Sequence, residues 1–100
     1  MRLRVHSIHF DADRKLIEFI QQKLDKLHTF YDRLTGGEVF LRLNNEGVEN
    51  KTVEIRIEVP GKKLFAKEHA RSFEAAVDSA TDSLRTQLDR FKSRLYDKRA

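Results

Sequence analysis

Between Ser72 and Leu95 the chain has apolar residues at spacings of three and four, the period of an α-helix that buries one face. The apolar positions are Phe73, Val77, Ala80, Leu84, Leu88, Phe91 and Leu95. A stripe of this length must be covered, either by a second helix in a coiled coil or by a sheet. The small Ala80 and the presence of one-sided strands elsewhere in the chain favour packing within one molecule. The stripe therefore predicts no self-association.

The charged residues of this helix are sorted by sign. Arg90 and Arg94 fall on one flank of the apolar stripe, together with Gln87, whereas the other flank carries Arg85 and Lys92. The acidic residues occupy the side expected to face solvent, and these are Asp78, Asp82 and Asp89. Separation of the signs suggests basic edges that bind a polyanion, and the alternative is an ordinary solvated amphipathic helix.

A second helix is expected after Asp11 or Asp13, either of which could cap it. Its apolar stripe consists of Leu16, Ile20, Leu24, Leu27, Tyr31 and Leu34. When the two helices pack side by side, we expect their basic flanks to merge into one RNA-binding surface, with Lys23 and Lys26 facing the Arg90 flank. The full candidate set is Lys15, Lys23, Lys26, Arg33, Arg85, Arg90, Lys92 and Arg94.

Four segments alternate apolar and polar residues, as strands with one buried face do. They cover residues 2–9, 38–43, 52–59 and 62–69. Turn residues at 44–47 and 60–61 separate the last three, so these strands should form an antiparallel meander. Each helix has one apolar stripe and each strand one apolar face, so both helices must cover the same side of the sheet. The predicted fold class is α+β, with the order β-α-β-β-β-α.

The composition excludes several classes of protein. The 100 residues are enough for one domain, residues 1–100, and the absence of cysteine excludes disulfides and thiolate chemistry. The four histidines lack metal-site spacing, and no Gly-rich phosphate loop or activated serine is present. We therefore expect no enzyme, no cofactor and no small-molecule substrate. No segment has the apolar run of a signal peptide or membrane span, so a cytoplasmic protein with no membrane partner fits best.

Two phenylalanines, Phe40 and Phe65, are expected on the sheet face that the helices leave open. Surrounded by basic residues, they could stack on single-stranded RNA bases, or anchor a protein partner if the chain is an adaptor. The third interpretation is cross-strand packing of these two phenylalanines on a partly exposed sheet. We favour this one, because the strand order differs from that of the familiar RNA-recognition fold.

The chain resembles a known family most clearly in three segments of its second half. These are Leu64–Lys67 (LFAK), Phe73–Ala80 (FEAAVDSA) and Leu84–Leu88 (LRTQL), at the end of the β-α-β-β-β-α order. On these residues the chain is similar to the ribosome hibernation-promoting factors, also called ribosome-associated inhibitors or sigma-54 modulation proteins. The resemblance covers nearly the whole chain.

The resemblance implies a four-stranded sheet with two parallel helices on one side. It also implies binding to the small ribosomal subunit between head and body, where the protein occludes the messenger and transfer RNA sites and catalyses nothing. The family's basic positions are matched by Lys23, Lys26, Arg90 and Arg94, whereas Ser83 and Thr86 are neutral where relatives are often basic. The chain lacks the extra dimerising domain of the long members, so it resembles the short form and is expected to be monomeric off the ribosome.

Overall fold

The computed structural model describes residues 2–44 and 46–99, with the backbone alone for residues 96–99. Its elements are β1 Arg2–Ile8, α1 Arg14–Phe30, β2 Gly36–Leu43, β3 Lys51–Val59, β4 Lys62–Ala70 and α2 Phe73–Arg99. Together they form a four-stranded sheet and two helices in the predicted order. The predicted α+β fold class is confirmed.

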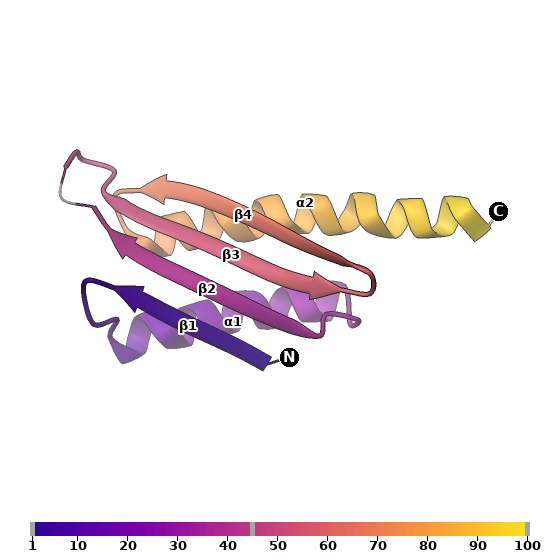
Figure 1. Ribbon diagram of the computed structural model, residues 1–100, viewed down its shortest axis with the longest axis horizontal. Helices are drawn as coiled ribbons and strands as arrows, with labels where there is room; N and C mark the ends of the chain where they lie inside the picture. Colours follow the sequence, from indigo (N-terminus) through magenta and orange to yellow (C-terminus); the bar gives the residue numbers. More distant parts are fainter. Residues whose placement is uncertain (1, 45, 100) are drawn as a thin grey trace.

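The four strands lie side by side in the order β1-β2-β3-β4. β1 pairs with β2 in parallel and the other two pairs are antiparallel, so the sheet is mixed and the predicted meander is present. A parallel pair needs a crossover connection, which α1 supplies. Figure 1 shows both helices behind the sheet and running in the same direction, with α1 behind β1 and β2 and α2 behind β3 and β4. The helices are therefore parallel neighbours in one layer.

Local sequence signals account for where the helices begin. Asp13 caps α1, because its Oδ1 accepts a hydrogen bond from the Leu16 amide at 2.8 Å. Ser72 caps α2 in the same way, with its Oγ 3.1 Å from the Ala75 amide nitrogen. α2 continues past Leu95 to Arg99 (Figure 1), because no Gly or Pro follows Leu95 that would end the helix.

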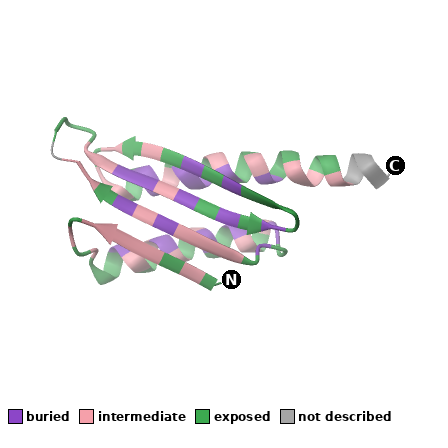
Figure 2. Cartoon of the chain, viewed as in Figure 1, coloured by how far each residue is buried: buried purple, intermediate pink, exposed green. Residues whose placement is uncertain are grey.

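The core lies between the sheet and the helices and is formed by the predicted stripes. Its fully buried members include Ile20, Leu24, Val39, Leu41, Val53, Ile55, Ile57, Leu84 and Leu88. Figure 2 shows buried and exposed residues alternating along β3, as expected for a strand with one covered face. In β1 the inward residues Leu3 and Val5 are only half-buried, because β1 is an edge strand.

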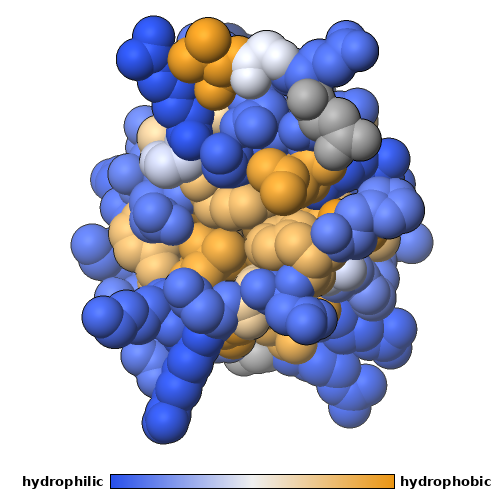
Figure 3. Space-filling view, turned by 90° about the vertical axis from the view of Figure 1, so that its left-hand side faces the viewer, coloured by the Kyte–Doolittle hydropathy of each residue, from blue (hydrophilic) through white to orange (hydrophobic). Residues whose placement is uncertain are grey.

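The core reaches the surface at the end of the molecule where both helices begin. Figure 3 looks onto this end, and apolar side chains gather there between hydrophilic ones. Phe10 precedes α1 and Phe73 begins α2, and their rings stack with centroids 4.9 Å apart. This stack joins the starts of the two helices and holds them in register.

Tyr31 follows α1 and is 7% exposed. Its hydroxyl is buried without a hydrogen-bond partner among the described residues, and its ring packs edge-on against Phe91. A buried unpaired polar group destabilises a folded protein by about 1–3 kcal/mol. We therefore expect Tyr31→Phe to raise the free energy of unfolding by about 1 kcal/mol, measured by urea denaturation. A clear loss of stability would show that the hydroxyl does have a partner.

Candidate nucleic-acid interface

The two helices meet along a seam that is organised by Phe30, the last residue of α1. The Arg85 guanidinium lies 4.8 Å from the centroid of the Phe30 ring, and Lys92 Nζ lies 4.5 Å from it. Lys92 Nζ also donates a hydrogen bond to the Phe30 carbonyl oxygen at 3.4 Å. One aromatic ring therefore holds two cations of α2 beside the C-terminal end of α1.

Lys23 lies on the same seam, nearer the beginning of the helices. Its Nζ is 2.6 Å from Asp78 Oδ1 of α2, and its side chain is only 29% exposed. We call Lys23, Arg85 and Lys92 the seam cations. In the described part of the chain, Arg85 and Lys92 have no carboxylate within 4 Å. Of the three seam cations, only Lys23 is therefore paired with an acidic residue, Asp78.

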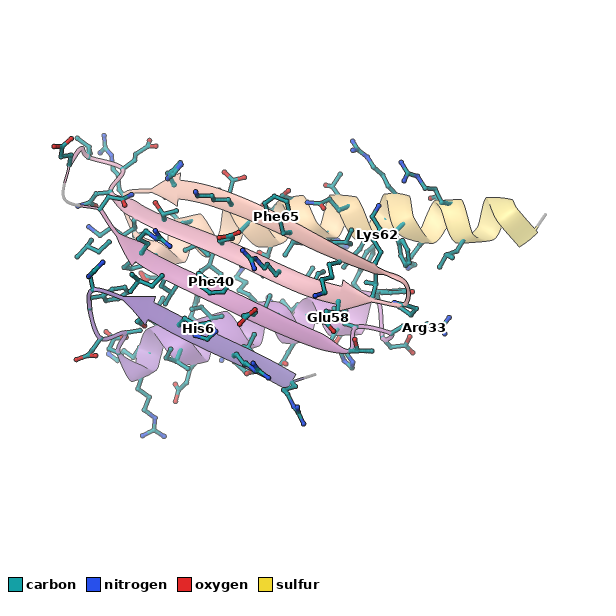
Figure 4. The ribbon with its side chains drawn as sticks, viewed as in Figure 1. His6, Arg33, Phe40, Glu58, Lys62 and Phe65 are labelled. Atoms are coloured by element: carbon teal, nitrogen blue, oxygen red, sulfur yellow. The ribbon has the colours of Figure 1, made fainter. Side chains whose placement is uncertain are left out.

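Three further candidate residues extend the basic surface on the α1 side, and we call Lys15, Lys26 and Arg33 the outer cations. All three are exposed. Figure 4 shows Arg33 near the end of α1, with its side chain reaching away from the body of the molecule. Within residues 2–44 and 46–95, no carboxylate lies within 4 Å of an outer cation. Their charges are therefore available to an anionic partner.

Arg90 and Arg94 lie on the flank of α2 that faces away from the seam. Gln87 on the same flank donates from Nε2 to the Phe65 carbonyl oxygen of β4 at 3.0 Å, which turns this flank toward the edge of the sheet. The expectation that Arg90 and Arg94 would merge with the α1 flank is therefore wrong.

The place beside α1 is taken by the other flank, which carries Arg85 and Lys92. The physical reason is the topology: the apolar stripe determines which side of α2 faces the sheet, but the position of α2 over β3 and β4 decides which flank meets α1. The structure thus places Lys23, Arg85 and Lys92 along the seam and separates Arg90 and Arg94 from them. An RNA-binding role for each of the eight residues stays a prediction.

Asp78 also differs from its expected position, because it lies in the seam rather than on the solvent side. Removing its charge should free Lys23 for an anionic partner. We expect Asp78→Asn to strengthen binding to a polyanion such as polyuridylate about two- to fivefold at low salt, an effect that disappears at high salt. Fold stability should change by less than about 1 kcal/mol, because both side chains are partly exposed.

The matched control is Asp25→Asn, which removes the same charge from α1. Asp25 accepts a hydrogen bond from Gln21 on the flank turned away from α2, so it should leave the seam unchanged. Affinity is measured for both variants at two salt concentrations. An equal gain from the two variants would mean that net charge alone is responsible.

On the open face of the sheet, aromatic and charged side chains of neighbouring strands contact one another. The ring of His6 stacks on that of Phe40 with centroids 4.8 Å apart, and the Arg56 guanidinium lies 5.0 Å from the Phe40 centroid. Phe40 is thus in cross-strand contact with neighbours on both adjacent strands, but these are His6 and Arg56 rather than the other phenylalanine. Phe65 differs, because it is 58% exposed. Figure 4 shows both phenylalanines on the face that the helices leave open.

Within residues 2–44 and 46–95, no group of three or more His, Cys, Asp or Glu residues could hold a metal ion. No helix in this part of the chain has the length and apolar character needed to cross a bilayer.

The sequence from residue 3 to residue 96 matches the family described as sigma 54 modulation protein / S30EA ribosomal protein. The chain belongs to this family. Among curated relatives, a ribosome hibernation promotion factor of Deinococcus radiodurans is 36% identical over 86 residues. That match covers 82% of this chain and 44% of the relative, so the chain spans less than half of that protein's length.

Shorter family members match over most of their length. A ribosome hibernation promoting factor of Escherichia coli is 28% identical over 95 residues, which is 95% of this chain and 97% of the relative. The corresponding factor of Pseudomonas putida is 24% identical, with 94% of this chain and 89% of the relative covered. These members are similar to this chain in extent as well as in sequence.

Two solved structures have the same fold. A ribosomal subunit interface protein from Coxiella burnetii superposes with a TM-score of 0.84 at 22% identity, covering 93% of this chain and 99% of that one. The N-terminal domain of Protein Y from Thermus thermophilus superposes with a TM-score of 0.80 at 25% identity, covering 91% and 99%. The β-α-β-β-β-α arrangement is thus shared at low sequence identity.

Sequence reasoning missed two residues of the seam. Phe30 falls outside the apolar stripe of α1, and Asp78 was assigned to solvent. The sequence did contain a signal for Phe30. It is an aromatic residue four positions after Lys26 and next to Tyr31, and this spacing puts it on a flank of the helix rather than on the outer side. No comparable signal identified the partner of Asp78, since that contact joins residues far apart in the sequence.

Proposed function

We propose that this chain inhibits translation by binding the small ribosomal subunit through the cations of its helix layer. Bound there, it covers the sites of messenger and transfer RNA. Membership of the family and the names of its relatives, which are ribosome hibernation promoting factors, support an association with the ribosome. The protein works by occlusion in the cytoplasm, as a monomer off the ribosome, and needs no cofactor.

The observation that carries the proposal is the seam. Arg85 and Lys92 are held against Phe30 on two packed helices, so little side-chain freedom remains to be lost when a phosphate is bound. The outer cations lie on the adjoining surface of α1. Basic side chains on rigid elements bind ribosomal RNA phosphates without reading base sequence.

Shape provides the remaining selectivity. The molecule measures 50 × 24 × 18 Å along its principal axes, so it is elongated and narrow. A cleft between two RNA-rich lobes would admit such a body along its length, and double-stranded RNA is recognised largely through shape and backbone. Messenger and transfer RNA would then be excluded, because the chain would occupy the volume in which they bind.

Occlusion predicts mutual exclusion with the natural ligands of the site. Small subunits saturated with the chain should no longer bind transfer or messenger RNA, and pre-bound transfer RNA should lower the affinity of the chain by the same factor, because linkage is reciprocal. Filter binding with labelled RNA measures both effects. A complex that holds chain and transfer RNA together with unchanged affinities would contradict occlusion and leave ribosome binding itself intact.

A second candidate function uses the open sheet face, either as a protein-protein adaptor or as a binder of single-stranded RNA. The exposure of Phe65 favours it, because a large apolar side chain in water is a common anchor for a partner. The packing of Phe40 between His6 and Arg56 speaks against base stacking, since the neighbours already cover the ring. The helix layer is therefore the first candidate.

A further inference from the structure

A hollow of about 570 Å³ lies on the open sheet face, at the end where β1 and β2 begin. Gly36 forms part of its floor, and because glycine has no side chain the sheet is left uncovered there. Four basic residues line it, namely Arg2, Arg4, Arg56 and Lys63. Two acidic residues, Glu38 and Glu58, complete the charged lining. We call this feature the Gly36 hollow.

The carboxylates of the hollow are already engaged by other residues. Glu38 Oε2 lies 2.8 Å from His6 Nε2, although Arg4 is the residue opposite Glu38 in the strand register. Glu58 Oε1 lies 4.0 Å from Lys63 Nζ. Four basic and two acidic residues leave the lining with a surplus of two positive charges.

The two arginines of β1 supply that charge. Among the described residues, neither Arg2 nor Arg4 has a carboxylate within 4 Å, whereas Arg56 binds Glu54 at 3.2 Å. Arg2 and Arg4 are exposed and alternate with the inward-facing Leu3, so both lie on the open face. The edge of the hollow thus carries two unpaired guanidinium groups.

The chemistry of these two groups selects an anion of a particular kind. Arginine forms bidentate hydrogen bonds with phosphate oxygens, and its charge is independent of pH. Two residues apart on a strand, the Cα atoms are separated by about 7 Å. That separation is comparable with the distance between successive phosphates of one RNA strand. A single carboxylate would satisfy only one of the two arginines.

We propose that the Gly36 hollow binds the phosphates of an RNA strand, as a second RNA contact on the face opposite the helices. The inference rests on the proposed function, because it takes ribosomal RNA as the partner. The domain then joins two RNA segments, one on each side, rather than lying on one surface. Such a two-sided contact suits a body that fills a cleft.

The hollow can be tested by charge removal and by filling. Arg2→Gln with Arg4→Gln is compared with Arg42→Gln with Lys67→Gln, which removes two cations of the same face outside the hollow. Gly36→Ile fills the hollow without changing charge, and Gly36→Ala is its control. A Cβ at Gly36 would contact only Arg2 O at 3.8 Å and Glu58 Oε2 at 3.9 Å, so the site has room for alanine. Circular dichroism must show that the larger Gly36→Ile variant is folded.

The measurements are affinity for small ribosomal subunits over a salt series and amide chemical shifts on titration with polyuridylate. The Arg2 and Arg4 double variant should bind about tenfold more weakly than the Arg42 and Lys67 double variant, and its salt slope should be lower by about 1.4, or 0.7 per lost phosphate contact. Gly36→Ile should reproduce the loss and Gly36→Ala should not. Polyuridylate should shift the Gly36 and Gly37 amides, whereas polyglutamate should not.

Several results would overturn the inference. Equal affinities of the two double variants, or normal binding by a stably folded Gly36→Ile protein, would exclude a phosphate contact in the hollow. Shifts with polyglutamate and none with polyuridylate would indicate a protein partner instead. If charge removal on the seam abolishes subunit binding while these variants bind normally, the hollow is excluded and the proposed function stands. If the seam variants also bind normally, both are excluded.

Discussion

Changing four helix-layer cations to glutamine is expected to weaken binding to small ribosomal subunits about a hundredfold at low salt. The four are Lys23, Lys26, Arg85 and Lys92. They come from both helices and flank the seam, so their loss removes the centre of the proposed interface. The loss of two cation–π contacts with Phe30 should lower stability by about 1–2 kcal/mol, and circular dichroism must confirm that the variant is folded.

Two double variants of α2 distinguish the effect of where the cations lie from the effect of losing two positive charges. Arg85→Gln with Lys92→Gln changes the seam, whereas Arg90→Gln with Arg94→Gln removes the same charge from the flank toward β4. We expect the larger loss of affinity from the seam pair. A larger loss from Arg90 and Arg94 would move the interface to the other flank of α2 and contradict the central role of the seam.

The sheet face serves as a third comparison. Phe40→Ala with Phe65→Ala should leave subunit affinity nearly unchanged, because their expected role is cross-strand packing worth about 0.2–1 kcal/mol per pair. Stacking on bases would instead be worth about 1–3 kcal/mol for each ring. A loss greater than that of the four-cation variant, at equal fold stability, would favour the sheet as the RNA-binding face.

The affinity of the unmodified chain for small subunits is expected to fall by a few hundredfold to about a thousandfold between roughly 50 and 200 mM salt. The reason is counterion release: each cation that neutralises a phosphate adds about 0.7–0.9 to the slope of log affinity against log salt. The seam and outer cations together supply enough charges for such a loss. Cosedimentation with ribosomes over a salt series measures the slope. A bound fraction that does not fall with salt would contradict a phosphate-dominated interface.

The sequence was sufficient to predict the elements and their layers. Apolar spacings identified both helices, and alternation such as Val53–Val59 identified the strands. The predicted stripe of the first helix ran too far, because α1 ends at Phe30 and its last two members, Tyr31 and Leu34, lie beyond the helix. These signals are local, and they arise because each element must bury one face. The two helices therefore had to share one side of the sheet, as they do in Figure 1.

The arrangement of the candidate site could be predicted only in part. The helical wheel separated Arg85 from Arg90 correctly, since that depends on spacing alone. It could not decide which of the two would face α1, because that choice depends on where α2 lies across the sheet. The pairing of Lys23 with Asp78 could not be predicted from the sequence either, since it depends on how far one helix is shifted along the other.

The contact between Lys92 and the Phe30 carbonyl oxygen links recognition to the integrity of α1. The last carbonyl groups of a helix carry partial negative charge and lack partners within the helix, and Lys92 supplies one of them with a donor from another element. Because an ammonium group has three N–H donors, Lys92 can hold this carbonyl oxygen and still donate to a phosphate. One nitrogen atom thus serves both RNA binding and the end of α1, so a substitution at Lys92 changes both properties.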